Sequence, residues 1–358
     1  MKAVIWGVGG TTIGFLRQKI MHHDYEIVCF TDNDSTLWGS VFYNDLQVIS
    51  PNELSKVDYD IIIICSLYYN EIRKQLIEEL NISCDKIITF KDIERKICNQ
   101  LVEKYEGQND EDLESVLKVY KNGDLHILGS YHPPITSFSE VLRDDEGFPY
   151  IMFFDKKMFF PKNYKFTKKN GKEIVEDILY EQGKDSPHQY LPEGFKMPDN
   201  SVIVDAGVCE GNFSLCYVEK AKKIYLIEAD EAWMEALKKT FEPYKDKVVF
   251  CNKFLSGRDN SQEITLDTLV KEDIDFLKMD IEGAEVEALL GGKEILSRSK
   301  AQCAICSYHR QYDEKYITYI LNSYGYITGH SKGYMFFSFD DNMIDTIDLR
   351  RGVIYGAK

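Results

Sequence analysis

The sequence predicts an α/β protein made of two domains, each with a largely parallel sheet covered by helices. Two segments begin alike, with a short apolar strand, a glycine turn, a helix and a second strand that ends in an acidic residue. The first segment begins at Ala3 and reaches Asp32, and the second begins at Val202 and reaches Glu228. Strands and helices go on alternating after each opening, which is typical of parallel sheets covered on both faces. A chain of 358 residues is long enough to bury two such cores.

The first opening begins an N-terminal domain, which we place at residues 1–100. Its turn is Gly7-Val8-Gly9-Gly10, where glycines let the backbone bend tightly and approach a ligand. Asp32 follows Gly7 by 25 residues, which suits a carboxylate that accepts hydrogen bonds from a ribose diol. We expect strands over 3–5, 26–30, 60–65 and 86–90, and helices over 15–21 and 70–80. Residues 101–149 are expected to be a linker and helical lead-in, with a surface helix or linker over 103–114.

The second opening belongs to a C-terminal domain, which we place at residues 150–358. Its lead-in is predicted to hold short strands and turns over 147–160, a helix over Glu173–Glu181 and a turn over Ser186–Tyr190. Beyond it we expect strands over 202–204, 224–227, 247–251, 275–279 and 301–306. Five helices are expected between and after these strands. Two of them end near Tyr217 and Leu290, and the other three span 231–241, 266–270 and 315–324. Both domains are therefore predicted to be Rossmann-like.

Composition and charge exclude several classes of partner. The net charge of −16 would repel a phosphate backbone, so nucleic acid is not expected to bind. No apolar run is long enough to span a bilayer, and the first residues lack the apolar core of an export signal. Nine cysteines without such a signal fit a reducing cytoplasm. Cys303 and Cys306 form a CxxC pair, but within a strand they would face opposite sides of the sheet, so we expect core packing and assign no metal.

Three blocks in the C-terminal domain resemble the signatures of the FkbM-type methyltransferases. They are Asp205-x-Gly207-x3-Gly211-Asn212-Phe213, Leu266-Asp267-Thr268-Leu269 and the run from Phe276 to Glu285 that contains Lys-x-Asp-x-Glu-Gly-x-Glu. The resemblance implies a class I methyltransferase fold, which is a seven-stranded mixed sheet with one antiparallel strand. It also implies S-adenosylmethionine as cofactor and a hydroxyl of a sugar, glycan or other small metabolite as acceptor. One position departs from the family, because Cys209 stands where the family usually carries Asn.

Within that resemblance, the glycine turn and the strand ends are expected to hold the cofactor. The backbone from Gly207 to Gly211 would pass under the methionine moiety, and Glu228 would accept both ribose hydroxyls. Asp280, at the end of the fourth strand, falls on the edge where open parallel sheets place their ligands. The predicted cofactor residues are Asp205, Gly207, Glu210, Gly211, Asn212, Phe213, Glu228, Ala229 and Asp280.

The predicted catalytic residues are Asp280, Glu282, His309 and His188. Asp280 and Glu282 could orient an acceptor hydroxyl, bind a divalent cation or, for Glu282 above all, simply cap the next helix. A histidine is the usual proton acceptor, so we expect His309 to take the hydroxyl proton, with His188 and then His330 as alternatives. Asp280 and His309 end consecutive predicted strands and can therefore converge. Arg310 could hold an anionic group of the substrate.

The N-terminal domain resembles the small Rossmann-like domain of bacterial sugar acyltransferases. The matching stretches are Ile5–Gly10, Phe30–Asp34 and Ile49–Leu54. The resemblance implies a bound nucleotide or nucleotide-sugar, and an empty scaffold or an oligomerisation unit remain alternatives. Thr12 stands where a dinucleotide fingerprint has its third glycine, which weakens a redox interpretation.

Three functions therefore remain open. The first is an O-methyltransferase acting on a small molecule or glycan; a nucleotide-linked acceptor and a homo-oligomeric state are both compatible with it. The second is an NAD(P)-dependent oxidoreductase, and the third is a nucleotide-sugar-binding protein with an inactive methyltransferase domain.

Overall fold

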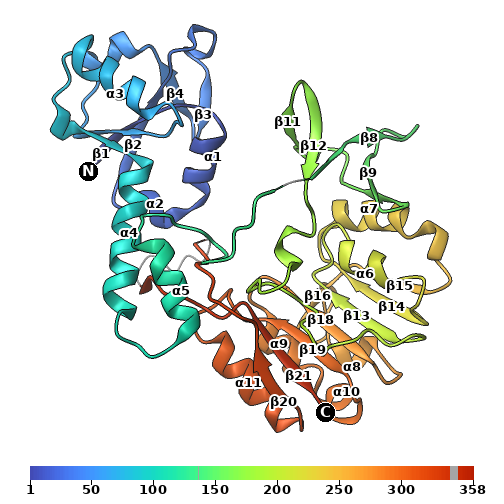
Figure 1. Ribbon diagram of the computed structural model, residues 1–358. Helices are drawn as coiled ribbons and strands as arrows, with labels where there is room; N and C mark the ends of the chain where they lie inside the picture. The colour runs from blue at the N-terminus through green and yellow to red at the C-terminus, as the bar shows by residue number, and fades with distance from the viewer. Residues whose placement is uncertain (136, 339–345) are drawn as a thin grey trace. The chain divides into compact units, whose positions relative to one another are not determined.

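The computed structural model describes residues 1–135, 137–338 and 346–358, and the chain divides into two compact units (Figure 1). The N-terminal unit consists of Met1–Ile127 and Phe336–Leu349. The C-terminal unit consists of Leu128–Met335 and Arg350–Lys358. The predicted boundaries at 100 and 149 stay a prediction. The chain returns to the N-terminal unit late in the sequence, over Phe336–Leu349.

The N-terminal unit is built on a six-stranded sheet in the order β3-β4-β2-β1-β5-β6. Its strands are β1 (Lys2–Trp6), β2 (Glu26–Thr31), β3 (Val41–Tyr43), β4 (Leu46–Ile49), β5 (Ile61–Ile64) and β6 (Ile87–Thr89). β1 lies between β2 and β5 and is parallel to both, with Trp6 opposite Thr31 on one side and Ile64 on the other. All four isoleucines of β5 are buried, as expected for a parallel strand covered on both faces.

Five helices complete the N-terminal unit among the described residues. They are α1 (Gly10–Arg17), α2 (Lys19–His22), α3 (Tyr69–Glu78), α4 (Phe90–Tyr105) and α5 (Glu111–Tyr120). The helix predicted over 15–21 is interrupted at Gln18, whose backbone is extended. Residues 103–114, predicted as a surface helix or linker, are divided between the end of α4 and the start of α5. α5 begins at the Asp110 cap and buries an apolar face, so it is part of the unit's packing.

The described ends of the segment Phe336–Leu349 join this unit through hydrogen bonds. Ser338 donates to the Gln18 side chain over 2.9 Å, and Lys104 Nζ donates to the Thr346 and Ile347 carbonyls over 2.8 Å each. The backbone N–H of Leu349 donates to the Tyr105 hydroxyl over 3.0 Å.

The C-terminal unit is built on a seven-stranded sheet in the order β15-β14-β13-β18-β19-β21-β20. Its strands are β13 (Val202–Ala206), β14 (Lys223–Ile227), β15 (Val248–Cys251), β18 (Phe276–Met279), β19 (Gln302–Cys306), β20 (Ile327–His330) and β21 (Val353–Ala357). β21 runs antiparallel to both of its neighbours, and the strands from β15 to β19 are parallel. The predicted seven-stranded mixed sheet with one antiparallel strand is therefore confirmed.

The helices of this unit follow the predicted alternation closely. They are α6 (Asn212–Tyr217), α7 (Glu231–Thr240), α8 (Leu266–Leu269), α9 (Glu285–Leu290), α10 (Lys293–Arg298) and α11 (Asp313–Ser323). Apolar residues of α8, α9, α10 and α11 pack with the sheet in one core that includes Leu266, Leu289, Leu296 and Leu321. A short parallel pair, β16 (Phe254–Leu255) and β17 (Glu263–Ile264), lies outside the main sheet.

The helix predicted over Glu173–Glu181 is wrong. The chain forms β12 (Lys172–Glu176), which pairs antiparallel with β11 (Thr167–Lys169) and β7 (Phe138–Glu140), and then a 3-10 turn over Tyr180–Gln182. The physical reason lies in the preceding Asn170-Gly171 pair, in which both residues have left-handed φ of 51° and 77°. That is the turn that suits a two-residue hairpin, and it commits the following residues to a strand.

The strands predicted over 147–160 are present as β9 (Pro149–Phe153) and β10 (Lys156–Phe159), which pair antiparallel, and β8 (Leu142–Arg143) pairs with β9.

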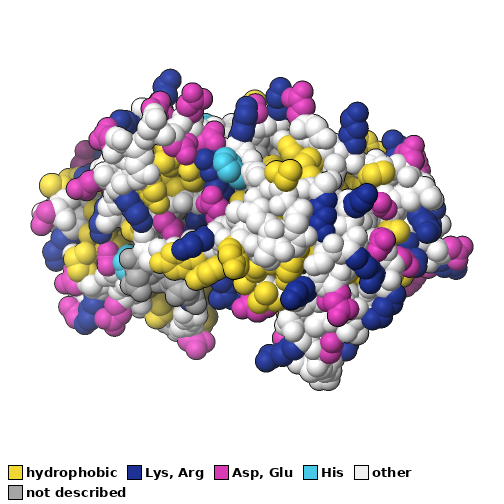
Figure 2. All heavy atoms as spheres, turned by 90° about the horizontal axis from the view of Figure 1, so that it is seen from below, with side chains coloured by type: hydrophobic (Ala, Val, Ile, Leu, Met, Phe, Trp, Pro, Cys, Tyr) yellow, Lys and Arg dark blue, Asp and Glu magenta, His cyan; other side chains and the backbone are white. Residues whose placement is uncertain are grey.

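Among the described residues, no helix combines the length and the apolar character needed to cross a membrane. Figure 2 shows Lys and Arg side chains interspersed with Asp and Glu over the face that it presents.

Candidate active site

Two adjoining cavities lie at the carboxyl edge of the C-terminal sheet and share three wall residues, Gly207, Cys209 and Asp280. We name them the Glu228 cavity, about 390 Å³, and the His188 cavity, about 400 Å³. The Glu228 cavity is also lined by Ala229, Trp233, Leu255, Ile281 and Glu282. The His188 cavity is also lined by Glu181, Tyr190, Glu210, Asn212 and Lys278. Asp280 therefore stands where the two cavities meet.

The glycine turn after β13 separates the cavities and is shaped by close packing. Gly207 has φ +73°, and a β-carbon there would collide with the Asp280 carbonyl oxygen. Gly211 has φ +82° and lies against Leu237 and Phe241. Cys209 also has a left-handed φ of 50°, which is unfavourable for Cys and several-fold more common for Asn. Because this chain has Cys instead of Asn at position 209, Cys209 must hold a left-handed backbone conformation that Asn adopts more readily.

The Glu228 carboxylate is fixed at the lip of its cavity by two backbone N–H groups. Cys209 N donates to one oxygen over 3.0 Å, and Asp230 N donates to the other over 2.9 Å. Because these bonds hold the carboxylate at the end of β14, its position suits the predicted role toward a ribose.

A buried ion pair anchors the turn from below. Lys278 Nζ lies 3.2 Å from Asp205 Oδ1 and donates to the Ala206 and Gly207 carbonyls over 3.3 and 2.5 Å. Burial alone would lower the pKa of Lys278, but the Asp205 and Asp280 carboxylates outweigh it and raise that pKa. Ser214 donates to Asp205 over 2.7 Å. Asp205 thus lies beneath the turn and lines neither cavity.

The remaining predicted cofactor residues are placed at different depths. Glu210 and Asn212 line the His188 cavity, and Asn212 also donates to the Ile178 carbonyl over 3.2 Å. Phe213 is buried against Tyr190 with ring centroids 5.8 Å apart, and it lines neither cavity.

Asp280 is surrounded by two tyrosines and two histidines. Tyr190 donates to Oδ2 over 2.8 Å, and Tyr308 donates to Oδ1 over 3.2 Å. His188 Nε2 lies 3.4 Å from Oδ2, and His309 Nε2 lies 3.4 Å from Oδ1. Burial alone would raise the pKa of Asp280, but His188, Lys278 and His309 hold it well below its ordinary value. Asp280 is therefore an ionised acceptor at the junction of the cavities.

Each histidine is backed by a second carboxylate. His188 Nδ1 lies 2.8 Å from Glu181 Oε2, and His309 Nδ1 lies 3.0 Å from Glu285 Oε1. Burial alone would lower the pKa of His188, but Asp280 and Glu181 raise it to about 9. The pKa of His309 is likewise raised, because Glu285 and Asp280 outweigh its burial.

The two histidines differ in their access to the cavities. His188 lines the cavity named after it, whereas His309 lines neither and reaches Asp280 from the side of α9. His309 follows β19, which pairs in parallel with β18, and so the two neighbouring strands bring His309 and Asp280 together. His330 ends β20, and its Nδ1 lies 2.9 Å from the Ser331 carbonyl, away from both cavities.

Glu282 and Arg310 occupy the rim of the site. Glu282 has a left-handed φ of 55°, and its exposed carboxylate lies 3.6 Å from His309 Nε2. The N–H of Ile281, before α9, is bound by Glu285 over 2.9 Å. Arg310 Nε donates to the Gly283 carbonyl over 2.6 Å, so its guanidinium is engaged with the backbone.

Two groups of side chains could hold a metal ion by ligand type and separation. His188, Asp280 and Cys306 form one, and Asp280, Glu285 and His309 form the other, with ligand atoms within 4.8 Å of one another. Cys306 Sγ lies 3.5 Å from His188 Nε2, while Cys303 packs in the core of the sheet. Ion pairs link His188 to Asp280 in the first group and His309 to Asp280 and Glu285 in the second, and we assign no metal.

Five residues of this site were not predicted from the sequence: Lys278, Glu285, Tyr308, Tyr190 and Glu181. Lys278 and Glu285 are the two ends of the Lys-x-Asp-x-Glu-Gly-x-Glu block, so the block itself was the signal. Tyr308 precedes His309, and Tyr190 follows His188 by two residues. Glu181 carried no signal, because it lay in the segment predicted as a helix.

The residues of this site lie in a segment that is similar to a known family of domains. Residues 191–328 match the family model described as the methyltransferase FkbM domain. This part of the chain is therefore similar to the methyltransferase FkbM domain. This match spans the glycine turn, Glu228, Asp280 and His309. Residues 1–88 match a model described as C2185-like, N-terminal, and the resemblance to sugar acyltransferases stays a prediction.

A solved structure supports the fold. The crystal structure of methyltransferase FkbM from Methylobacillus flagellatus KT is 16% identical, with a TM-score of 0.52 over 99% of this chain and 89% of that one. Weaker likenesses include precorrin-6y C5,15-methyltransferase from Geobacter metallireducens, 14% identical with a TM-score of 0.32 over 46% of this chain and 84% of that one. Magnesium protoporphyrin IX methyltransferase from Synechocystis, with bound SAM, is 17% identical with a TM-score of 0.31 over 45% and 71%. No curated protein matches the chain.

Proposed function

We propose that the FkbM domain uses S-adenosylmethionine to methylate a hydroxyl of a sugar, glycan or related small metabolite. The observation that carries the proposal is the position of Asp280, an ionised acceptor at the junction of two cavities beside the glycine turn of a methyltransferase domain. When bound, the cofactor supplies an electrophilic methyl group on a positively charged sulfur.

The residues present fit that cofactor. Glu228 offers a fixed carboxylate for a ribose diol, and the turn Gly207–Gly211 leaves the backbone open to a ligand. Asp280 and Glu282 line the Glu228 cavity, so two carboxyl groups face the space where a cationic sulfonium would be stabilised. Trp233 and Leu255 give the same cavity an apolar wall suited to a purine.

The His188 cavity has the character of an acceptor site. Glu181, Glu210, Asp177 and Glu176 line it, and their carboxyl groups would repel an anionic acceptor while accepting hydrogen bonds from sugar hydroxyls. This lining favours an uncharged polyhydroxy group at the reacting end of the substrate.

Asp280 and His188 would share the handling of the acceptor proton. Asp280 stays ionised and can orient a hydroxyl, and neutral His188 can take the proton at Nε2, which lies 3.4 Å from Asp280 Oδ2. Glu181 holds the opposite ring nitrogen of His188 and so fixes the orientation of the ring. We predicted His309 as the first choice of base. Because it lines neither cavity and contacts Asp280 Oδ1, we propose instead that it positions the Asp280 carboxylate.

The direct test of the cofactor is calorimetric titration of S-adenosylhomocysteine into the full chain. Glu228→Ala should weaken binding by roughly 10- to 100-fold, because a charged hydrogen-bond acceptor contributes about 1.5–3 kcal/mol. Glu235→Ala is the matched control, since Glu235 is an exposed residue of α7 outside the cavity. Unchanged affinity in folded Glu228→Ala would reject the ribose assignment, and no binding to the wild type would reject the function. Acceptors would then be screened among free and nucleotide-linked sugars by release of S-adenosylhomocysteine.

A further inference from the structure

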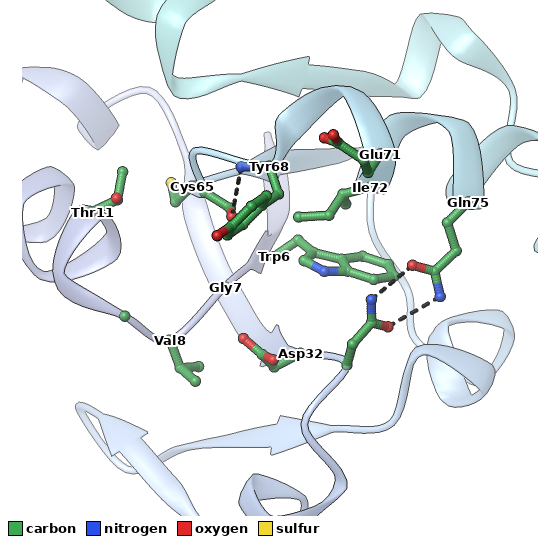
Figure 3. Close-up of a pocket in the computed structure, with 13 residues that line it drawn as sticks. Trp6, Gly7, Val8, Thr11, Asp32, Cys65, Tyr68, Glu71, Ile72 and Gln75 are labelled. Atoms are coloured by element: carbon green, nitrogen blue, oxygen red, sulfur yellow. Dashed lines mark hydrogen bonds between the residues drawn. The ribbon is translucent and has the colours of Figure 1, made fainter. Parts of the chain in front are cut away.

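A third cavity, about 450 Å³, lies in the N-terminal unit and is independent of the methyltransferase site (Figure 3). It opens at the carboxyl ends of three parallel strands, β1, β2 and β5. Its walls come from the turn after β1, from Asp32 after β2, from Cys65 to Tyr68 after β5, and from Glu71 and Gln75 of α3. A volume of this size falls in the range of small-molecule sites.

The cavity coincides with the point where the strand order reverses. From β1 the chain proceeds to β2 and β4 on one side of the sheet, and it then returns to place β5 on the other side of β1. In open α/β sheets, the crevice outside the strand ends at such a reversal is where ligands bind. The position of the cavity is therefore set by the topology.

The glycine turn is built to stay open toward this cavity. Gly7 has φ +114°, and a β-carbon there would come within 2.7 Å of the Cys65 carbonyl oxygen. The buried Thr12 hydroxyl lies 2.9 Å from the Gly7 carbonyl and 3.2 Å from the Cys65 carbonyl, so it ties the two loops together. At Gly9 and Gly10 an added β-carbon would meet nothing within 4 Å. α1 begins at Gly10 without a side-chain cap, which leaves its first N–H groups for an acceptor on a ligand.

The side chains around the turn favour a ligand with hydroxyl donors and a flat ring. Asp32 and Glu71 carry carboxylates, and no Lys or Arg occurs among the described residues of the lining. Asp34 N donates to Asp32 Oδ1 over 3.0 Å, which fixes that carboxylate at the end of β2. Trp6 lies beneath the cavity as a core residue that is 1% exposed, and Tyr68, 71% exposed, offers a ring at the rim near it (Figure 3).

The opposite rim is closed by a pair of amides. Asn33 donates to the Gln75 oxygen over 2.9 Å, and Gln75 donates to the Asn33 oxygen over 3.0 Å. Gln75 lies near the Trp6 ring in Figure 3. This reciprocal pair connects the loop after β2 to α3 and so gives the cavity a defined edge next to Asp32.

We propose that this cavity binds the ribonucleoside part of a nucleotide at a site separate from the methyl donor. Asp32 accepts hydrogen bonds from the ribose diol, Tyr68 contacts the base, and the first N–H groups of α1 receive the phosphate. A free nucleoside diphosphate, a nucleotide-sugar and a dinucleotide share this chemistry.

The experiment titrates the full chain with UDP, UDP-glucose, ADP and NAD, and separately with S-adenosylhomocysteine. At least one nucleotide should bind, and its 2′-deoxy counterpart should bind on the order of 10- to 100-fold more weakly, because the carboxylate loses a charged hydrogen bond. Asp32→Asn should weaken the same nucleotide to a similar extent and leave S-adenosylhomocysteine unchanged. Asp45→Asn is the matched control, an exposed residue of the same unit in the turn between β3 and β4.

Glu228→Ala tests the converse, because it changes the methyl-donor site only; it should leave the affinity for the nucleotide unchanged. Nucleotide binding that is lost in Glu228→Ala but kept in Asp32→Asn would place the nucleotide in the methyl-donor site and overturn the proposal. Absence of binding by all four nucleotides at millimolar concentration would overturn it as well. Comparison of the deoxy ligand with the ribose ligand on wild-type protein keeps the test decisive if Asp32→Asn fails to fold. A failure of S-adenosylhomocysteine to bind would bear on the proposed function alone.

Discussion

The Nδ1 atom of His309 lies 3.0 Å from the Glu285 carboxylate, and both side chains are buried in the C-terminal unit. Replacing Glu285 with Gln removes the negative charge and leaves His309 facing an amide. We expect the free energy of unfolding near pH 7 to fall by about 3 kcal/mol, because breaking a buried ion pair leaves one partner uncompensated. Urea unfolding measures this change, and the NMR titration of His309 should show a lower pKa than in the wild type. Glu287→Gln, on an exposed position of α9, is the control; equal stability of the two variants would contradict the pairing.

His188 should make stability depend on pH in the alkaline range. Its folded pKa of about 9 lies above the ordinary value of 6.5, so its stabilising contribution is complete below pH 6.5 and is lost as the pH rises through 9. The contribution is on the order of 3 kcal/mol, since each pKa unit corresponds to about 1.4 kcal/mol. The difference in unfolding free energy between wild type and His188→Gln should therefore shrink between pH 6 and pH 9.5. A difference that stays constant across this range would show that His188 is not a charged partner of Asp280.

Asp280→Asn should reduce turnover far more than cofactor affinity. The change keeps the shape of the side chain and removes the charge that orients the acceptor and faces His188. Loss of a positioned proton-handling group costs about 10²- to 10⁴-fold in rate. The measurement is the initial rate at saturating S-adenosylmethionine, with S-adenosylhomocysteine affinity determined in parallel. Asp246→Asn, at an exposed site beyond α7, serves as the control. Near-normal turnover in folded Asp280→Asn would remove Asp280 from the reaction.

The rate of methyl transfer should rise with pH. His188 can accept a proton only when it is neutral, and with a pKa of about 9 its neutral fraction increases about tenfold per pH unit below that value. The logarithm of kcat should therefore climb with a slope near one and level off near pH 9. His188→Gln should lose the slope along with most of the rate. A wild-type profile that is already flat between pH 6 and pH 8 would assign the proton to a different group.

Cys209→Asn should stabilise the protein by about 0.5 kcal/mol, because Asn tolerates the left-handed φ of 50° better than Cys does. Thermal unfolding measures the gain. Cys84→Asn is the control, since Cys84 is exposed and does not have a left-handed backbone. A lower melting temperature for Cys209→Asn would mean that the thiol makes a contact that outweighs the strain.

The sheets were largely predictable because their determinants are local. Glycine turns, apolar strands and the alternation with helices placed β13, β14 and β18, and the pairing of β18 with β19 then brought Asp280 and His309 together. The lead-in was not predictable in the same way. Ile174 and Ile178 are four residues apart and imitate a helical face, although Asn170-Gly171 indicates a hairpin.

Other parts of the site depend on contacts that no local pattern encodes. Glu181 meets His188 only because the chain turns after β12, and Tyr190 meets Asp280 across 90 residues of sequence. The return of Phe336–Leu349 to the N-terminal unit could not be predicted either, because no local sequence pattern in this segment indicates which unit it packs against.

That return has a consequence for biosynthesis. Lys104 and Ile347, which are joined by a hydrogen bond, are 243 residues apart in the chain. A ribosome that adds about 5–20 residues per second needs roughly 10–50 s to travel between them. Well before that interval ends, the first 127 residues have left the exit tunnel without the segment that α4 and Gln18 will bind. The N-terminal unit, although translated first, is therefore completed only when Phe336–Leu349 has been made, and the nascent protein must carry an uncovered surface on α4 until nearly all of the C-terminal unit has been translated.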